Sequence, residues 1–99
     1  MNYVVIFKAK TKALDHAYYA TAQLLREKAL TQFHCQKFET ISEQNFEIAL
    51  SYWYSLSDIQ AWHQDAEHQV AQQFAKEHWY QFFSVEICKV ERRYAFVPS

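Results

Sequence analysis

The 99-residue chain contains no glycine. Loops that wrap a phosphate group in backbone N–H donors depend on glycine, because a residue without a Cβ lets the backbone approach the phosphate closely. The sequence therefore excludes the P-loop and the glycine-rich dinucleotide-binding turn. Tight hairpin turns, which favour glycine at positive φ, must be built here from asparagine or other residues.

Length and composition predict one domain that associates with a second copy of itself. Residues 1–99 fit a single domain, and a domain of this size buries only a modest core. Yet 51% of the residues are apolar and 18% are aromatic, which is more than one small sheet-and-helix layer usually hides. A two-fold homodimer is the simplest way to cover the surplus.

The charge of the chain and its first residues indicate which partners to expect and where in the cell the protein is found. The formal net charge is −1 and the chain has no long basic run, so nucleic acid and acidic membrane surfaces are not expected as partners. The first residues lack a basic segment, Lys8 interrupts the first apolar run, and no stretch is long enough to cross a membrane. We therefore predict a cytoplasmic protein in which Cys35 and Cys88 are free, buried thiols.

Hydrophobic periodicity predicts six elements in the order βαββαβ. Strands are expected over residues 3–10, 33–41, 46–54 and 82–96, and helices over 15–30 and from 57 to about 79, the second with a kink and a new cap at Asp65. This order is typical of an α+β, ferredoxin-like fold with a four-stranded antiparallel sheet and both helices on one face. The other sheet face is also apolar, so we expect two copies to pack these faces together into a dimeric α/β barrel.

All three tryptophans lie between Ser51 and Tyr80. Trp62 falls one turn into the second helix, on the same side as Ile59, and is either a core anchor or one wall of a cavity between helices and sheet. Trp53 is either a filler of the barrel or interface, or part of a substrate-binding surface.

His68, Gln72 and Trp79 follow one line along the second helix, at the edge of its apolar arc, which includes Phe74. A histidine in such a position serves either as a general acid or base or as a hydrogen-bonded residue at the helix margin. Arg92, near the end of the last strand, is either an anchor for an anionic or phenolic substrate or a solvated surface residue.

The histidines of the second helix do not predict a metal site. His63, His68 and His78 are spaced by five or ten residues, which turns their side chains away from one another on a helix. We therefore expect no metal.

Residues 46–96 resemble the antibiotic biosynthesis monooxygenase (ABM) family. The matching residues are Ser51-Tyr52-Trp53, Ser55-Leu56, Asp58-Ile59, Ala61-Trp62, Glu67-His68, Ala71-Gln72, Trp79-Tyr80, Val85, Val90-Glu91-Arg92 and Tyr94. The resemblance implies a homodimeric α+β barrel with a cavity between the sheet and the helices of each subunit.

The same resemblance implies several activities. Family members include cofactor-free oxygenases of polycyclic phenols, haem-degrading enzymes and many proteins without a known activity. The haem-degrading branch has an asparagine on the first strand, an early tryptophan on the second helix, and an iron-binding histidine about three turns later. Trp62 matches, but Gln72 is a poor iron ligand and the first strand offers only Val4, Val5 and Ile6 at its middle. Haem degradation is therefore disfavoured.

Two functional hypotheses follow. In the first, the protein is a small monooxygenase without a bound cofactor that acts on an electron-rich aromatic or quinol-type molecule. Its cavity would be walled by Trp62, Trp79 and Phe74, and His68 would take the substrate's proton. In the second, the protein is a non-catalytic dimeric module that binds a small apolar ligand, and His68 is only a structural hydrogen-bond partner.

Overall fold

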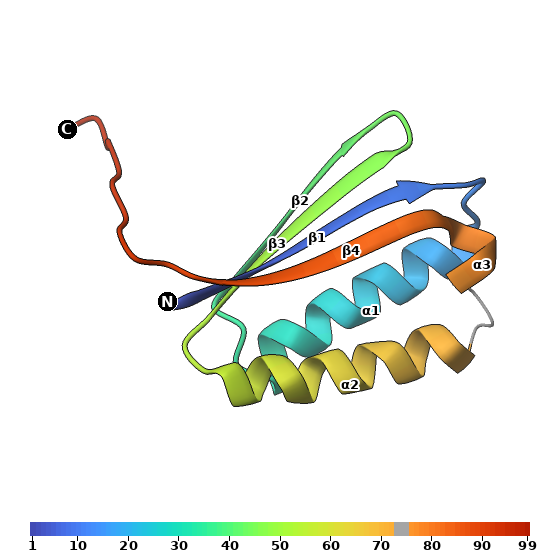
Figure 1. Cartoon of the computed structure of the whole chain (residues 1–99), viewed down its shortest axis with the longest axis horizontal. Helices are drawn as coiled ribbons and strands as arrows, with labels where there is room; N and C mark the ends of the chain where they lie inside the picture. Colours follow the sequence, from blue (N-terminus) through green and yellow to red (C-terminus); the bar gives the residue numbers. More distant parts are fainter. Residues whose placement is uncertain (73–75) are drawn as a thin grey trace.

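The computed structural model describes residues 1–72 and 76–99, with side chains described outside residues 69–77. Its elements are β1 (Tyr3–Thr11), α1 (His16–Gln32), β2 (Lys37–Glu43), β3 (Phe46–Trp53), α2 (Leu56–Gln72), α3 (Lys76–Trp79) and β4 (Tyr80–Lys89). The strands form one antiparallel sheet in the order β2-β3-β1-β4. Helices α1 and α2 lie side by side on one face of that sheet (Figure 1). The predicted ferredoxin-like α+β class is confirmed.

Strand register assigns each sheet residue to one of two faces. Ile6 of β1 pairs with Leu50 of β3 and with Glu86 of β4. The alternate residue Val5 is buried, so it marks the face under the helices. The main core cluster lies on that face and contains Val5, Ala29, Cys35, Trp53 and Ile59.

The opposite face is apolar and only partly covered within one chain. Its central rows carry Val4, Ile6, Ile48, Leu50 and Tyr52, all of which remain partly accessible. None of the helices that the structure describes covers this face (Figure 1). None of the helices in the described part of the chain is both long and apolar enough to span a lipid bilayer.

Both long helices begin at a side-chain cap. The Oδ1 atom of Asp15, the first residue of the predicted helix 15–30, accepts a hydrogen bond from the backbone N–H of Tyr18 at 2.9 Å. The start of α2 was predicted at Ser57, and this prediction was wrong. Ser55 is the cap, because its Oγ atom accepts from the N–H groups of Ser57 at 3.1 Å and Asp58 at 3.4 Å. The helix therefore begins at Leu56.

Asp65 does not interrupt α2. The predicted kink and second cap at this residue are absent, and the helix runs without a break from Leu56 to Gln72. The Asp65 carboxylate instead lies 2.8 Å from Nζ of Lys28 on α1. This partly buried ion pair ties the two helices together, which is a use of Asp65 that capping statistics do not capture.

Two residues other than glycine adopt the left-handed conformation. His34 has φ 68° directly after α1, and Gln44 has φ 54° in the two-residue turn between β2 and β3. Glycine is the usual choice at both kinds of position. The turn falls in the gap between the predicted strands 33–41 and 46–54, and β2 lies a few residues further along the chain than predicted.

The last strand is shorter than the sequence predicted. β4 ends at Lys89, and the remaining residues lead away from the sheet as an irregular segment (Figure 1). Hydrogen bonds connect this segment to the start of the chain: the N–H of Val90 donates to the carbonyl of Asn2, and Arg93 Nη2 donates to the carbonyl of Met1. The alternation of Val90, Tyr94 and Phe96 had suggested a strand to residue 96.

Candidate functional site

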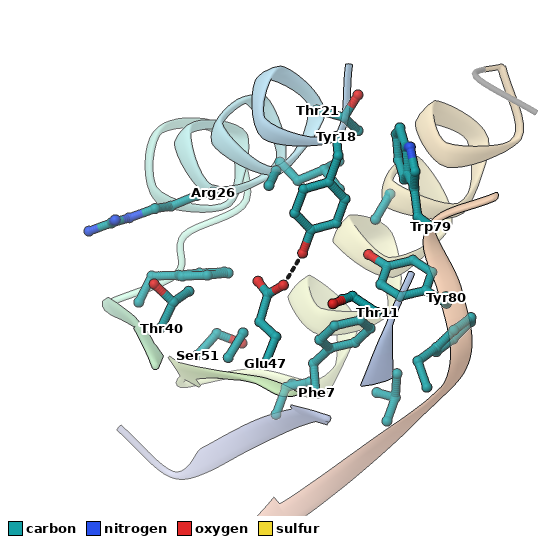
Figure 2. A pocket seen from close by; sticks show the side chains of 18 of the residues that line it. Phe7, Thr11, Tyr18, Thr21, Arg26, Thr40, Glu47, Ser51, Trp79 and Tyr80 are labelled. Atoms are coloured by element: carbon teal, nitrogen blue, oxygen red, sulfur yellow. Dashed lines mark hydrogen bonds between the residues drawn. The ribbon is translucent and has the colours of Figure 1, made fainter. Parts of the chain in front are cut away.

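A cavity of about 780 Å³ separates the helical layer from the sheet. All four strands and both long helices contribute to its lining (Figure 2). Small side chains on the covered face of the sheet create the space, because Thr11, Ala49 and Ser51 stand where larger residues would meet the helices. The volume is in the range of small-molecule sites.

Aromatic rings form one end of this cavity. Trp79 is buried and meets the ring of Tyr18 edge-on, with 5.3 Å between centroids. Tyr80 contacts Phe7 and Phe83, with centroid separations of 5.8 and 5.4 Å. These rings come from α1, β1 and the junction of α3 with β4, so a flat apolar molecule would find aromatic contacts from several directions.

One carboxylate lies among these rings. Glu47 projects from β3 into the cavity and accepts a hydrogen bond from the hydroxyl of Tyr18 (Figure 2). The structure pairs this carboxylate with no cation in the part of the chain that it describes. Burial therefore raises the pKa of Glu47 above its ordinary value.

The neighbouring phenol is held in its neutral form. Burial, and then the negative charge of Glu47, raise the pKa of Tyr80 far above that of a free tyrosine. Tyr80 therefore keeps its proton at any physiological pH. It can donate a hydrogen bond into the cavity but does not serve as a base.

The predicted tryptophans occupy different positions. Trp62 lines the cavity, and its indole N–H donates to the carbonyl of Leu25 at 3.0 Å, so only the ring is presented to a ligand. Trp53 is fully buried beneath it, with 5.4 Å between the two ring centroids and its N–H donated to Ser51 Oγ at 2.8 Å. Trp79 also lines the cavity, whereas Trp53 supports Trp62 from the core.

Of the remaining predicted site residues, His68 and Arg92 do not line the cavity, and the side chains of Gln72 and Phe74 lie outside the described part of the chain. His68 is exposed on α2 and is not among the lining residues. Arg92 is exposed in the segment after β4. Gln72 ends α2 with an undescribed side chain, and Phe74 lies outside the described residues.

Within the described residues, one imidazole lines the cavity. His63 lies next to Trp62 on α2, and its Nε2 atom is 3.3 Å from Oε1 of Glu67, one helical turn away. No group of three histidine, cysteine, aspartate or glutamate side chains with metal-binding geometry occurs in the described part of the chain.

Sequence reasoning missed Glu47, Tyr18 and Tyr80. A signal for Glu47 was present, because it alternates in register with Ala49, Ser51 and Trp53, and the last of these faces the core. A carboxylate in such a row must either be buried or line a cavity. Tyr18 falls within the predicted helix 15–30, but nothing in the sequence indicated that its hydroxyl would meet a residue of β3.

Comparison with curated proteins finds one family relationship. The chain is 32% identical over 95 residues to the uncharacterised protein YqjZ of Bacillus subtilis (strain 168), covering 95% of this chain and 83% of that protein. No model of a known protein family matches the sequence.

Solved structures share the fold at low sequence identity. A dimeric ferredoxin-like protein from an uncultured marine organism matches with a TM-score of 0.69 and 6% identity, covering 97% of this chain and 100% of that one. A putative antibiotic biosynthesis monooxygenase from Chloroflexus aurantiacus J-10-fl gives a TM-score of 0.62 at 9% identity, covering 96% and 98%. The structure of the MhuD R26S mutant, with two manganese protoporphyrin IX molecules bound per active site, matches with a TM-score of 0.51 and 15% sequence identity. The match covers 94% of this chain and 99% of that one.

Proposed function

The chain belongs to the same family as YqjZ and has the fold of antibiotic biosynthesis monooxygenase-like domains, and from this premise we propose that it oxygenates an electron-rich aromatic hydroxyl compound without a bound cofactor. The observation that carries the proposal is the cavity under the helices, in which aromatic rings surround one half-buried carboxylate, that of Glu47. Such a site is apolar enough to bind a polycyclic phenol and has a group that can take a proton.

Oxygenation of such a compound requires few catalytic groups, because the deprotonated substrate itself supplies the electrons to O₂. A phenol or its keto tautomer becomes a strong electron donor once it has lost a proton. The anion can then pass electrons to O₂ and form a carbon–oxygen bond. For anthrone the balance is anthrone plus O₂ giving anthraquinone plus water, with both electron pairs supplied by substrate C–H bonds. The protein supplies a dry cavity, orientation and a proton acceptor.

We also propose that the protein works as a homodimer. The apolar sheet face opposite the helices has Ile6 and Leu50 at its centre, and the described residues leave it partly accessible. A second copy is the partner of matching shape and chemistry, and the marine ferredoxin-like protein with the same fold is dimeric.

The residues of the cavity do not fit a haem. Among the described residues, the ionisable groups around the aromatic end of the cavity are the Glu47 carboxylate and the phenols of Tyr18 and Tyr80, and the buried polar groups Thr11, Thr21 and Ser51 are hydroxyls. The raised pKa of Tyr80 disfavours the tyrosinate that an iron would require. His63 lines the cavity but is engaged with Glu67. Haem degradation is therefore not part of the proposal.

Oxygenation is tested with anthrone under ¹⁸O₂, followed by mass spectrometry of the product. We expect anthraquinone carrying one ¹⁸O atom, formed faster than in the absence of protein. In Ala49→Phe, which fills the cavity, the rate should fall at least tenfold, whereas Ala20→Phe on the exposed side of α1 should leave it unchanged. Unlabelled product, or equal rates in both variants, would refute oxygenation in this cavity.

The alternative is a binding module that uses the same cavity. In that case anthrone quenches tryptophan fluorescence, because Trp62 and Trp79 line the cavity, but no oxygen is consumed. Fluorescence and an oxygen electrode, used on the same samples, separate the two functions.

A further inference from the structure

We propose that Glu47 is the proton acceptor and recognition group for an aromatic hydroxyl in the cavity, and that Tyr18 positions it. The proton-transfer part of this inference rests on the proposed function; the recognition part does not. It transfers to Glu47 the role that the sequence had suggested for His68, which is exposed on α2 and is not among the residues lining the cavity.

Geometry is the first support. Glu47 reaches the cavity from β3, and Tyr18 meets it from α1, so the sheet and a helix together fix the carboxylate (Figure 2). The hydrogen bond from Tyr18 uses Oε2. In the described part of the chain no donor is recorded on Oε1, and a carboxylate accepts several hydrogen bonds. A ligand hydroxyl can therefore donate to Oε1.

The surroundings favour this use of the carboxylate over a structural ion pair. The ionisable groups that face Glu47 are the phenols of Tyr18 and Tyr80, and both are neutral donors. The other charged or titratable groups lining the cavity are Arg26 on α1 and His63 and Glu67 on α2, with the phenol of Tyr19 also on α1. Arg26 lies over the Phe38 ring, 6.0 Å from its centroid, and His63 is paired with Glu67.

The proposed step conserves charge inside the cavity. The hydroxyl O–H bond of the ligand, or the C10–H bond of anthrone in its keto form, breaks and the proton moves to Oε1 of Glu47. The products are a protonated carboxyl group and an aryl oxide anion, so one negative charge is present before and after. Burial raises the pKa of Glu47 and brings it closer to that of a phenol, which improves proton transfer. Tyr80, which keeps its proton, is the nearby donor for the new anion.

Turnover of anthrone gives the first test. Glu47→Gln keeps the shape of the side chain but cannot take a proton, so we expect the rate to fall about 100-fold or more. Glu27→Gln removes an exposed carboxylate from α1 and should leave the rate unchanged. If Glu47→Gln retains turnover within threefold of the parent protein, the assignment of the base is overturned while the proposed oxygenation stands.

The positioning role of Tyr18 has its own readout. Its hydroxyl stabilises the charged carboxylate, so Tyr18→Phe should raise the pKa of Glu47 further. The acid limb of the rate–pH profile should then move to higher pH, whereas loss of packing alone would lower the rate at every pH. An unmoved acid limb would contradict the positioning role.

Binding decides the recognition role even if no anthrone is consumed. We expect the parent protein to bind 2-naphthol about tenfold more tightly than naphthalene, because the hydroxyl donates to a charged acceptor. In Glu47→Leu this preference should vanish, while naphthalene binding shows that the cavity is intact. Glu27→Leu should keep the preference. If Glu47→Leu still prefers 2-naphthol, Glu47 is not the recognition group.

Discussion

Among the single residues, Glu47 combines partial burial with the absence of a recorded cation partner in the described part of the chain. It is a carboxylate in an apolar cavity with a phenolic hydroxyl, rather than a cation, as its partner. Proteins retain such groups at functional sites at a cost in stability. That cost should be measurable in the absence of any ligand.

The partial burial of Glu47 predicts a pH-dependent gain in stability for Glu47→Gln. Because the folded-state pKa of Glu47 is raised, its contribution is favourable below the ordinary glutamate pKa of about 4.3 and is lost as pH rises through the folded-state pKa. The variant lacks this loss. Its urea midpoint should therefore exceed that of the parent by more at pH 8 than at pH 4.

Glu27→Gln is the matched control, since its carboxylate is exposed on α1. Its midpoint relative to the parent should show no comparable change between the two pH values. A midpoint difference for Glu47→Gln that is the same at pH 4 and pH 8 would show that burial does not perturb this carboxylate.

At the scale of the secondary-structure elements, the side-chain cap of α2 can be tested by mutation. At the start of α2, Ser55→Ala should lower the free energy of unfolding by about 1 kcal/mol, because it removes the acceptor for two backbone N–H groups. Ser57→Ala should cost clearly less, since its recorded side-chain contact is with the hydroxyl of Ser55. Urea denaturation of both variants measures the difference, and the reverse order would restore Ser57 as the cap.

Most of the fold follows from periodicity in the sequence. The alternation in β3 and the cap at Asp15 were sufficient to place their elements, because both depend on neighbouring residues. The predicted cap at Asp65 and the predicted end of the last strand at residue 96 were wrong for the same reason. An aspartate satisfied by Lys28 of another helix, and a chain that leaves its sheet after Lys89, depend on contacts that are distant in sequence.

The candidate site was only partly predictable for the same reason. Trp62 and Trp79 were placed at the cavity from helical spacing. The pairing of Tyr18 with Glu47 joins residues 29 positions apart, and no pattern in either segment encodes it. His68 was favoured because imidazole titrates near neutral pH, which is a property of the residue type and not of its position.

At the scale of the whole molecule, the proposed dimer makes the uncovered sheet face essential. Leu50→Lys introduces a charge at the centre of this face and should convert the protein to monomers or unfold it. Leu24→Lys, on the exposed side of α1, should leave the assembly unchanged. Analytical ultracentrifugation measures the mass, and a parent protein that is a stable monomer at micromolar concentration would contradict the dimer.

The most direct measurement is a crystal structure of the protein with 2-naphthol bound. The naphthalene ring should lie in the cavity between the sheet and the helices, against Trp62 and Trp79, with the hydroxyl oxygen within hydrogen-bond distance of Glu47. A ligand bound outside this cavity, or inside it with the hydroxyl directed away from Glu47, would contradict the account.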